Sequence, residues 1–219
     1  MELSEAARLL HVSEATLQRW VRQGLMPASG DADDPFRVDE LRRWADERGL
    51  PFGESSARTP QRAERMLSSA VGRGAVLRGV TAANASEVVE HLVRAVPDLE
   101  ADERALVLER VLDRERLAST ALGHGVALPH PRAPVAGLLA DPVVVVAHLR
   151  RPVDWAALDG VPVHTALLLL SPSAPVHLQL LSRVSHALKQ PGVDAWLAAG
   201  TTQAEFVERV RAIEEASGK

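Results

Sequence analysis

The sequence predicts an α/β protein in which a mixed sheet is flanked by helices, with a small helical domain before it. From Leu67 onward, short apolar runs typical of strands alternate with segments of helical periodicity. The first 50 residues contain short amphipathic helices instead. Residues 51–66 are polar and carry two prolines and a glycine, which is typical of a linker. We therefore expect a domain at 1–50, a linker at 51–66 and an α/β domain at 67–216.

Composition narrows the class of protein. The chain has 46% hydrophobic and 25% charged residues, as in globular proteins. It has no cysteine, which excludes disulfides and thiolate zinc sites. The first residues lack the pattern of a signal peptide, and the apolar run at 167–170 is too short to span a bilayer. We expect a cytoplasmic location without membrane insertion.

Residues 1–50 show the order of a winged helix-turn-helix domain. One helix is expected to begin at Leu3. A second follows Ser13 as its N-cap and ends at Gly24. Phe36-Arg37-Val38 is interpreted as a return strand, and Asp39 as the cap of a final helix.

The stretch LSEAARLLHVSEATLQRWVRQGLMPA, together with FRVDELRRWADERG, resembles the MerR/excisionase type of DNA-binding domain. The resemblance implies that the second helix faces DNA and that a wing contributes a further cation. The DNA-contacting candidates on the helix are Thr16, Gln18, Arg19 and Arg22, and Arg37 would lie on the wing.

The charge of this domain argues against strong DNA binding by itself. Residues 1–50 hold seven arginines and ten acidic residues, a net charge of −3. Phosphate contacts supply much of the affinity of DNA-binding proteins, so an acidic domain needs dimerisation or a partner to bind DNA well. A helix-turn-helix scaffold that contacts proteins is therefore the alternative.

The α/β domain is expected to begin with a strand at Ala75–Val80. Its second helix runs from Asp102 to Arg114, and the strand at Val143–Leu149 should be buried on both faces. The other expected elements are a helix capped by Ser86, strands at Val126–Leu128 and Val163–Leu170, and helices at Ala174–Lys189 and Thr202–Glu215.

The stretch RERLASTALGHGVALPH, residues 114–130, carries the chemistry. It ends with Pro129-His130 directly after a predicted strand, where the stiff proline backbone would hold the histidine. A neutral imidazole is a nucleophile near pH 7, and the fork of donors on Arg114 suits phosphoryl oxygens. The sequence therefore points to a phosphoryl-accepting His130.

This domain resembles the IIA domains of the fructose/mannitol phosphotransferase type, including the nitrogen-regulatory IIA proteins. The resemblance is carried by residues 114–130 and by LLLLSPSAPVHLQLLSRVSHAL, and it implies an IIA-type mixed-sheet sandwich. It implies that His130 is phosphorylated, that His177 is its active-site partner and that Arg114 stabilises the oxyanion. The implied donor is a phosphocarrier resembling HPr.

Three further side chains are candidates for phosphate binding. The hydroxyls of Ser119 and Thr120 could donate to a phosphoryl group. Arg132 stands where some sugar-specific IIA domains carry an acid, and this departure puts sugar transport in doubt more than phosphorylation.

Several readings remain open. The first is a regulatory phosphocarrier, that is, a phosphoryl-transfer protein. The sequence does not decide whether it acts as an enzyme. The second is a DNA-binding regulator that uses the IIA fold as a non-catalytic sensor. The third is regulation of a kinase or transporter through protein contacts alone. We expect no cofactor. A zinc site from His124, His130 and His177 fits by ligand type, but no short-spaced ligand pair supports it. The oligomeric state is not indicated.

Overall fold

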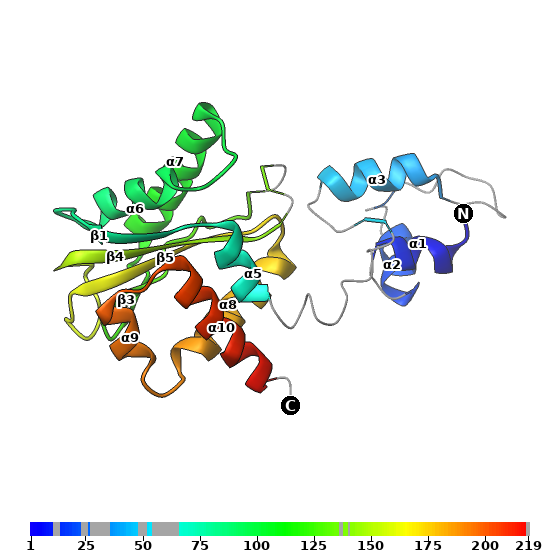
Figure 1. The fold of residues 1–219 in the computed structure, drawn as a ribbon. Coiled ribbons are helices and arrows are strands. Elements are labelled where there is room, and N and C mark those ends of the chain that lie inside the picture. Colours follow the sequence, from blue (N-terminus) through cyan, green and yellow to red (C-terminus); the bar gives the residue numbers. More distant parts are fainter. Residues whose placement is uncertain are drawn as a thin grey trace. The chain divides into compact units, whose positions relative to one another are not determined.

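The computed structural model describes residues 1–10, 14–22, 26, 36–47, 52–53, 66–135, 138–139 and 141–217. The chain divides into two compact units, Met1–Ala63 and Glu64–Lys219 (Figure 1). Each unit has its own hydrophobic core and is described separately.

The described part of the first unit consists of helices around one small core. The helices are α1 (Leu3–Leu9), α2 (Glu14–Arg22) and α3 (Val38–Glu47). The core includes the buried side chains of Leu10, Leu17, Phe36 and Leu41. Buried residues recur at helical spacing at Ala6, Ala7 and Leu10 and again at Leu41, Trp44 and Ala45, so α1 and α3 each turn one apolar stripe inward.

The predicted return strand at 36–38 is wrong. Val38 is the first residue of α3, and the Arg37 carbonyl accepts a hydrogen bond from the Leu41 amide at 3.0 Å. Val38-Asp39-Glu40-Leu41 therefore continues one amphipathic helix, with Leu41 facing the core. The predicted caps Ser13 and Gly24, and residues 27–35 of the expected wing, lie outside the described residues.

The second unit is a five-stranded mixed sheet with helices on both faces, which confirms the predicted fold class. The strand order is β1-β4-β5-β3-β2. β1 pairs with β4 and β3 with β5 in parallel, while β4–β5 and β2–β3 are antiparallel. The strands are β1 (Val76–Val80), β2 (Ala121–Gly123), β3 (Val126–Ala127), β4 (Val143–Val153) and β5 (Val163–Leu170).

Helices α6 and α7 cover one face of the sheet, and α5, α8, α9 and α10 cover the other (Figure 1). Alternate residues of the central strands serve the two faces. Val145 and Leu168 pack toward α6 and α7, whereas Val146 and Leu169 pack toward the opposite helices. The helices are α5 (Met66–Arg73), α6 (Ala85–Arg94), α7 (Ala101–Leu117), α8 (Ala174–Leu188), α9 (Val193–Ala199) and α10 (Gln203–Ser217).

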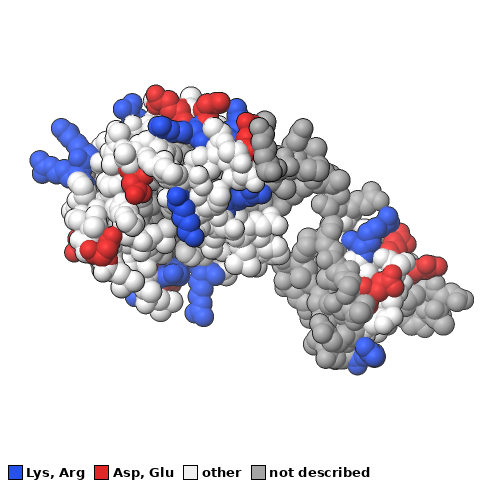
Figure 2. All heavy atoms as spheres, turned by 90° about the horizontal axis from the view of Figure 1, so that it is seen from below, with Lys and Arg blue, Asp and Glu red and all other residues white. Residues whose placement is uncertain are grey.

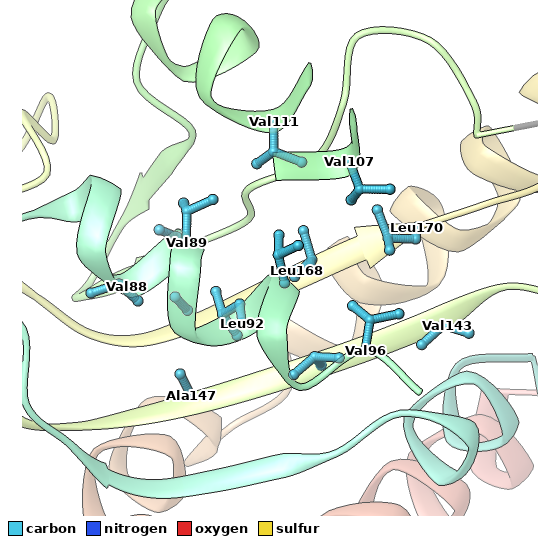
Figure 3. Packing of buried hydrophobic residues seen from close by; sticks show 14 of the residues in the cluster. Val88, Val89, Leu92, Val96, Val107, Val111, Val143, Ala147, Leu168 and Leu170 are labelled. Carbon is cyan, nitrogen blue, oxygen red and sulfur yellow. The ribbon is translucent and has the colours of Figure 1, made fainter. Parts of the chain in front are cut away.

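The core under α6 and α7 fixes the helix that leads to the candidate site. Val88 and Leu92 of α6 and Val107 and Val111 of α7 are fully buried against β4 and β5 (Figure 3). Burial of this kind contributes roughly 1.5–3 kcal/mol for each aliphatic side chain. The C-terminal end of α7 is thereby held beside the sheet.

Helix α6 begins two residues earlier than the sequence indicates. Its N-cap is Asn84, whose side-chain oxygen accepts a hydrogen bond from the Glu87 amide at 3.0 Å. Ser86 is therefore the second residue of the helix and not its cap. The Glu87 carboxylate accepts in turn from the Ala83 amide, so the start of α6 is held by two reciprocal contacts.

Candidate functional site

The candidate site lies where β3 and β5 end, at the edge of the sheet next to the start of α8. The Leu128 amide donates to the Thr120 carbonyl, and the Leu169 amide donates to the Pro129 carbonyl, both at 3.0 Å. The backbone just before His130 is therefore bonded on both sides. Pro129 adds a fixed φ, and the imidazole is presented from a rigid segment.

His130 and His177 are brought together from segments 47 positions apart. Their ring centroids lie 5.2 Å apart, with the ring planes tilted by 44°. β5 ends at Leu170, Ser173 is the N-cap of α8, and the His177 amide donates to the Ser173 carbonyl. His177 thus stands in the first turn and a half of α8, near orphan backbone N–H groups that favour an anion.

The tautomer of His130 follows from its hydrogen bond. Nδ1 lies 2.7 Å from the Leu128 carbonyl oxygen. A carbonyl only accepts, so Nδ1 carries the proton and Nε2 keeps its lone pair. This arrangement makes Nε2 the nucleophilic atom of the ring.

The surroundings favour the neutral form of both imidazoles. Burial lowers the pKa of His130, and the Arg114 cation lowers it further, whereas the hydrogen bond to Leu128 and the charge of Glu115 raise it. Burial also lowers the pKa of His177, and the neighbouring His130 acts in the same direction. Both rings are therefore available as neutral imidazoles at pH 7.

Arg114 lies in the last turn of α7. One of its guanidinium nitrogens, Nη1, donates to the Ala118 carbonyl at 2.7 Å, which closes the end of the helix. The positive charge of Arg114 contributes to the lowered pKa of His130. Its other donors are not engaged in any hydrogen bond within the described part of the chain.

The three further phosphate-binding candidates have different surroundings. The Ser119 hydroxyl donates to the Trp155 carbonyl, and the Thr120 hydroxyl donates to a Glu115 carboxylate oxygen. Each hydroxyl would have to give up its present acceptor before it could donate a hydrogen bond to a phosphoryl group. Arg132 is exposed two residues after His130.

Glu115 is a site residue that the sequence pattern did not single out. Its carboxylate accepts from the Thr120 amide at 2.8 Å, the Thr120 hydroxyl at 2.6 Å and Trp155 Nε1 at 2.8 Å. It therefore ties the end of α7 to Thr120, whose carbonyl accepts from the Leu128 amide, and to a buried tryptophan 40 positions away. A lone Glu after Arg114 gives no sign of this role, because Trp155 is distant in the chain.

The glycines of the predicted loop lie in the β2–β3 hairpin. Gly123 and Gly125 have φ of +92° and +74° and flank His124, whose amide donates to Asp159 Oδ2 at 2.7 Å. A Cβ on Gly125 would overlap the His164 ring. The described residues contain no cluster of three metal-ligating side chains.

The DNA-contacting candidates lie in the first unit. Gln18 and Arg22 are exposed on α2, and Arg37 is exposed just before α3. The side chains of Thr16 and Arg19 lie outside the described residues.

The fold and the site define a class of protein. Residues 72–212 match the family described as phosphoenolpyruvate-dependent sugar phosphotransferase system, EIIA 2. This match covers more than half of the chain, and the chain belongs to that family. Residues 1–49 match a family described as helix-turn-helix domain.

Its relatives include nitrogen regulatory proteins. The chain is similar to those of Pseudomonas aeruginosa, at 36% identity over 55% of this chain and 76% of the relative, and Bradyrhizobium diazoefficiens, at 30% identity over 58% and 82%. Its structure resembles the nitrogen regulatory protein IIA-Ntr of Neisseria meningitidis, with a TM-score of 0.53 and 28% identity over 62% of this chain and 91% of that one. The mannitol IIA of Escherichia coli has the same fold, with a TM-score of 0.52 and 21% identity over 62% and 94%.

No helix in the described part of the chain has both the length and the apolar character that a bilayer-spanning segment needs.

Proposed function

We propose that the chain is a regulatory phosphocarrier of the EIIA type that accepts a phosphoryl group on His130. The observation that carries the proposal is the pairing of His130 with His177 5.2 Å away, with Nδ1 of His130 held by the Leu128 carbonyl. In this family such a pair supports acceptance from a phosphohistidine on an HPr-like protein. A N–P bond forms at Nε2 of His130 as the N–P bond of the donor imidazole breaks, and the donor ring keeps that electron pair.

The residues around the pair have separate tasks in this step. The neutral state of His130 supplies the lone pair, and the Leu128 carbonyl accepts from the Nδ1 proton, which stabilises the positive charge that develops on the ring. Arg114 offers guanidinium donors to the equatorial phosphoryl oxygens. His177 and the first turn of α8 lie on the other side of the transferred group, where backbone N–H groups favour negative charge.

The test is phosphotransfer from labelled phosphoenolpyruvate through purified donor proteins. We expect label on the wild-type chain and none on His130→Ala, while His177→Ala is labelled more slowly. His124→Ala is the matched control, because it removes an exposed imidazole outside the pair. Absence of label on the wild type, or equal labelling of His130→Ala, would refute the proposal.

The helix-turn-helix unit would transmit the phosphorylation state of His130, either through contacts with a protein partner or through DNA binding. Three exposed candidates, Gln18, Arg22 and Arg37, are consistent with DNA contact. On the face drawn in Figure 2, however, the described atoms of this unit present acidic and basic side chains next to one another. A kinase or transporter as regulated partner is therefore an equal candidate for the output.

A DNA-binding regulator with a non-catalytic EIIA module is the second candidate function, favoured by the helix-turn-helix match at residues 1–49. It predicts specific binding whose affinity falls with salt and is the same for phosphorylated and unphosphorylated chain. Arg22→Gln should weaken such binding, whereas Arg116→Gln in the other unit should not. Affinity that changes with phosphorylation would favour the first function.

A further inference from the structure

A hollow lies at the end of the sheet opposite His130. It has a volume of about 480 Å³ and is lined by Thr81, Ala82, Ala83, Arg150 and Arg151. The first three residues connect the end of β1 to α6, and the two arginines lie on β4. Its volume falls within the range of roughly 300–1,000 Å³ that is usual for small-molecule sites.

The hollow is separate from the candidate phosphorylation site. Val143, at the start of β4, pairs with Leu170, next to the strand end that carries His130. Arg150 lies seven residues further along β4, which corresponds to roughly 23 Å at the rise of a strand. A ligand in the hollow would therefore not touch His130.

The positive charges of Arg150 and Arg151 are not balanced by an acidic partner in the described part of the chain. In the part of the chain that the structure describes, neither the Arg150 side chain nor the Arg151 side chain forms a hydrogen bond or an ion pair. The arginine at the end of α7, Arg116, is different, because it pairs with Asp113 at 2.6 Å. The nearby Glu87 is already used, since its carboxylate accepts from the Ala83 amide and from the Asn84 side chain.

We propose that this hollow binds a small organic phosphate as a dianion. A guanidinium presents a planar fork that matches phosphoryl oxygens, and the charges of the two arginines that line the hollow match a double negative charge. The Thr81 hydroxyl supplies a further donor at the same wall. The remaining volume and the methyl groups of Ala82 and Ala83 accommodate the organic part, so an ester should bind more tightly than inorganic phosphate.

The experiment is titration of the full chain, labelled with ¹⁵N, and followed by amide chemical shifts. The probes are glucose 6-phosphate, ADP and inorganic phosphate, each in the wild type, Arg150→Gln, Arg151→Gln and the control Arg116→Gln. We expect saturable shifts at Thr81–Ala83 and Arg150–Arg151 with one of the two esters. Each hollow variant should bind about tenfold to a hundredfold more weakly, as loss of a charged hydrogen-bonding partner does, and the control should bind as the wild type does.

Four outcomes would overturn the proposal. One is the absence of saturable shifts at these amides with either ester. Another is unchanged affinity in both Arg150→Gln and Arg151→Gln with their amide spectra otherwise intact. The third is inorganic phosphate binding as tightly as the esters, because the hollow would then not recognise the organic part. Shifts confined to His130 and its neighbours would also count against it, since they would report the other site.

Discussion

At the scale of single residues, His130 is set apart by how its protonation is controlled. Its Nδ1 proton is committed to the Leu128 carbonyl, which alone would raise the pKa. Burial and the Arg114 cation act in the opposite direction, and burial is the largest effect. The result is a ring that stays neutral at pH 7 and keeps a lone pair at Nε2.

Removing the Arg114 charge should raise the pKa of His130. Arg114→Gln takes away a cation that disfavours the protonated ring, so the titration midpoint moves upward. In ¹H–¹³C NMR titrations of the imidazole, Arg116→Gln should leave the midpoint where it is in the wild type. A downward shift in Arg114→Gln would contradict the electrostatic account. If Arg114 also binds the phosphoryl group, phosphotransfer should slow by about tenfold or more, as loss of a charged hydrogen bond implies.

Glu115→Gln should loosen the loop that supports His130. The glutamine oxygen can accept from the Thr120 amide and from Trp155 Nε1, but the NH₂ group then replaces the oxygen that accepts from the Thr120 hydroxyl. That hydroxyl must turn from donor to acceptor, and all three hydrogen bonds lose the charge of the carboxylate. We expect about 1–3 kcal/mol less stability, altered Trp155 fluorescence and slower phosphotransfer. The pKa of His130 should fall, because Glu115 raises it.

Trp155→Phe is the matched variant, because it removes only one of the three hydrogen bonds to Glu115. It should cost less stability than Glu115→Gln and leave Thr120 held. Equal effects of the two variants on the pKa of His130 would show that the carboxylate charge is not responsible.

The residues of 114–130 predicted His130 and Arg114, the family resemblance added His177, and the structure brings the two imidazoles together. The contacts that hold the two imidazoles in place could not be predicted from the sequence. The Ser119 hydroxyl donates to the Trp155 carbonyl, 36 positions away, and the indole of Trp155 donates to Glu115. Such contacts depend on the path of the segment after β4, for which local spacing carries no signal.

At the scale of elements, the β2–β3 hairpin is held by a close approach of backbone to a side chain. Gly125 has φ of +74°, and any Cβ there would overlap the His164 ring. Gly160 has a similar φ of +70°, but nothing lies within 4 Å of its Cβ position. A substitution at Gly160 therefore introduces backbone strain alone, whereas the same substitution at Gly125 introduces backbone strain and a steric overlap.

Gly125→Ala should destabilise the protein more than Gly160→Ala. Both variants place a side chain at positive φ, which costs about 1–3 kcal/mol. Gly125→Ala adds an overlap with His164 that costs about 1–3 kcal/mol more. Urea unfolding of each variant measures the difference. Equal free energies of unfolding would show that His164 moves aside without cost.

The first and last helices of the larger unit are joined by a buried carboxylate. Glu214 of α10 accepts from the amides of Leu67 and Ser68, at 2.7 and 3.2 Å, and from the Ser68 hydroxyl at 2.6 Å. It therefore caps the start of α5 from 146 positions away, and its charge faces the positive end of that helix.

Glu214→Gln should lower the free energy of unfolding by about 1–3 kcal/mol, because a buried NH₂ group would then face backbone donors. Glu208→Gln on the same helix is the control. It disrupts only an exposed pair with Arg211, so its effect should stay within about 1 kcal/mol. Denaturant unfolding of both variants measures the two free energies of unfolding. Equal decreases would show that Glu214 does not stabilise the start of α5 as a cap.

The elements that the sequence predicted well are those with long apolar periodicity, such as β5 at Val163–Leu170. The short ones were missed for physical reasons. β2 has three residues and ends in a glycine, and α9 has seven residues between two glycines of positive φ. α5 was hidden because its first turn is capped by Glu214 and not by a neighbour in sequence. β4 extends to Val153 through charged residues that resemble a loop.

At the scale of the whole molecule, the candidate chemistry belongs to one unit. Every residue discussed around His130 lies between Glu64 and Lys219, and that unit has its own core on both faces of the sheet. The helix-turn-helix unit has a separate core. The proposed phosphorylation site and the proposed output therefore belong to separate units, and stability can be measured on the larger unit alone.

Four histidines of this unit should make it less stable in mild acid. Burial is the main cause that lowers the pKa of each, namely His130, His148, His164 and His177. Below about pH 6.5, the ordinary value, the unfolded chain binds protons that the folded unit does not. The free energy of unfolding should therefore fall as the pH drops from 6.5 through the lower folded values, and it should be flat above about pH 7.5.

Calorimetry of residues 64–219 between pH 8 and 5 measures this dependence. His148 is buried between the hydroxyls of Thr165 and Thr201, at 3.3 and 3.2 Å from its two ring nitrogens, so its protonation requires both hydroxyls to accept from the ring. His148→Gln removes one titrating group and should make the fall in the unfolding midpoint shallower between pH 6.5 and 5. Depressed acids such as Glu205 act only at lower pH, because their ordinary values lie near 4.5. A midpoint that stays constant or rises as the pH drops below 6.5 would mean that the folded unit binds these protons as readily as the unfolded chain, and that burial does not keep the imidazoles neutral.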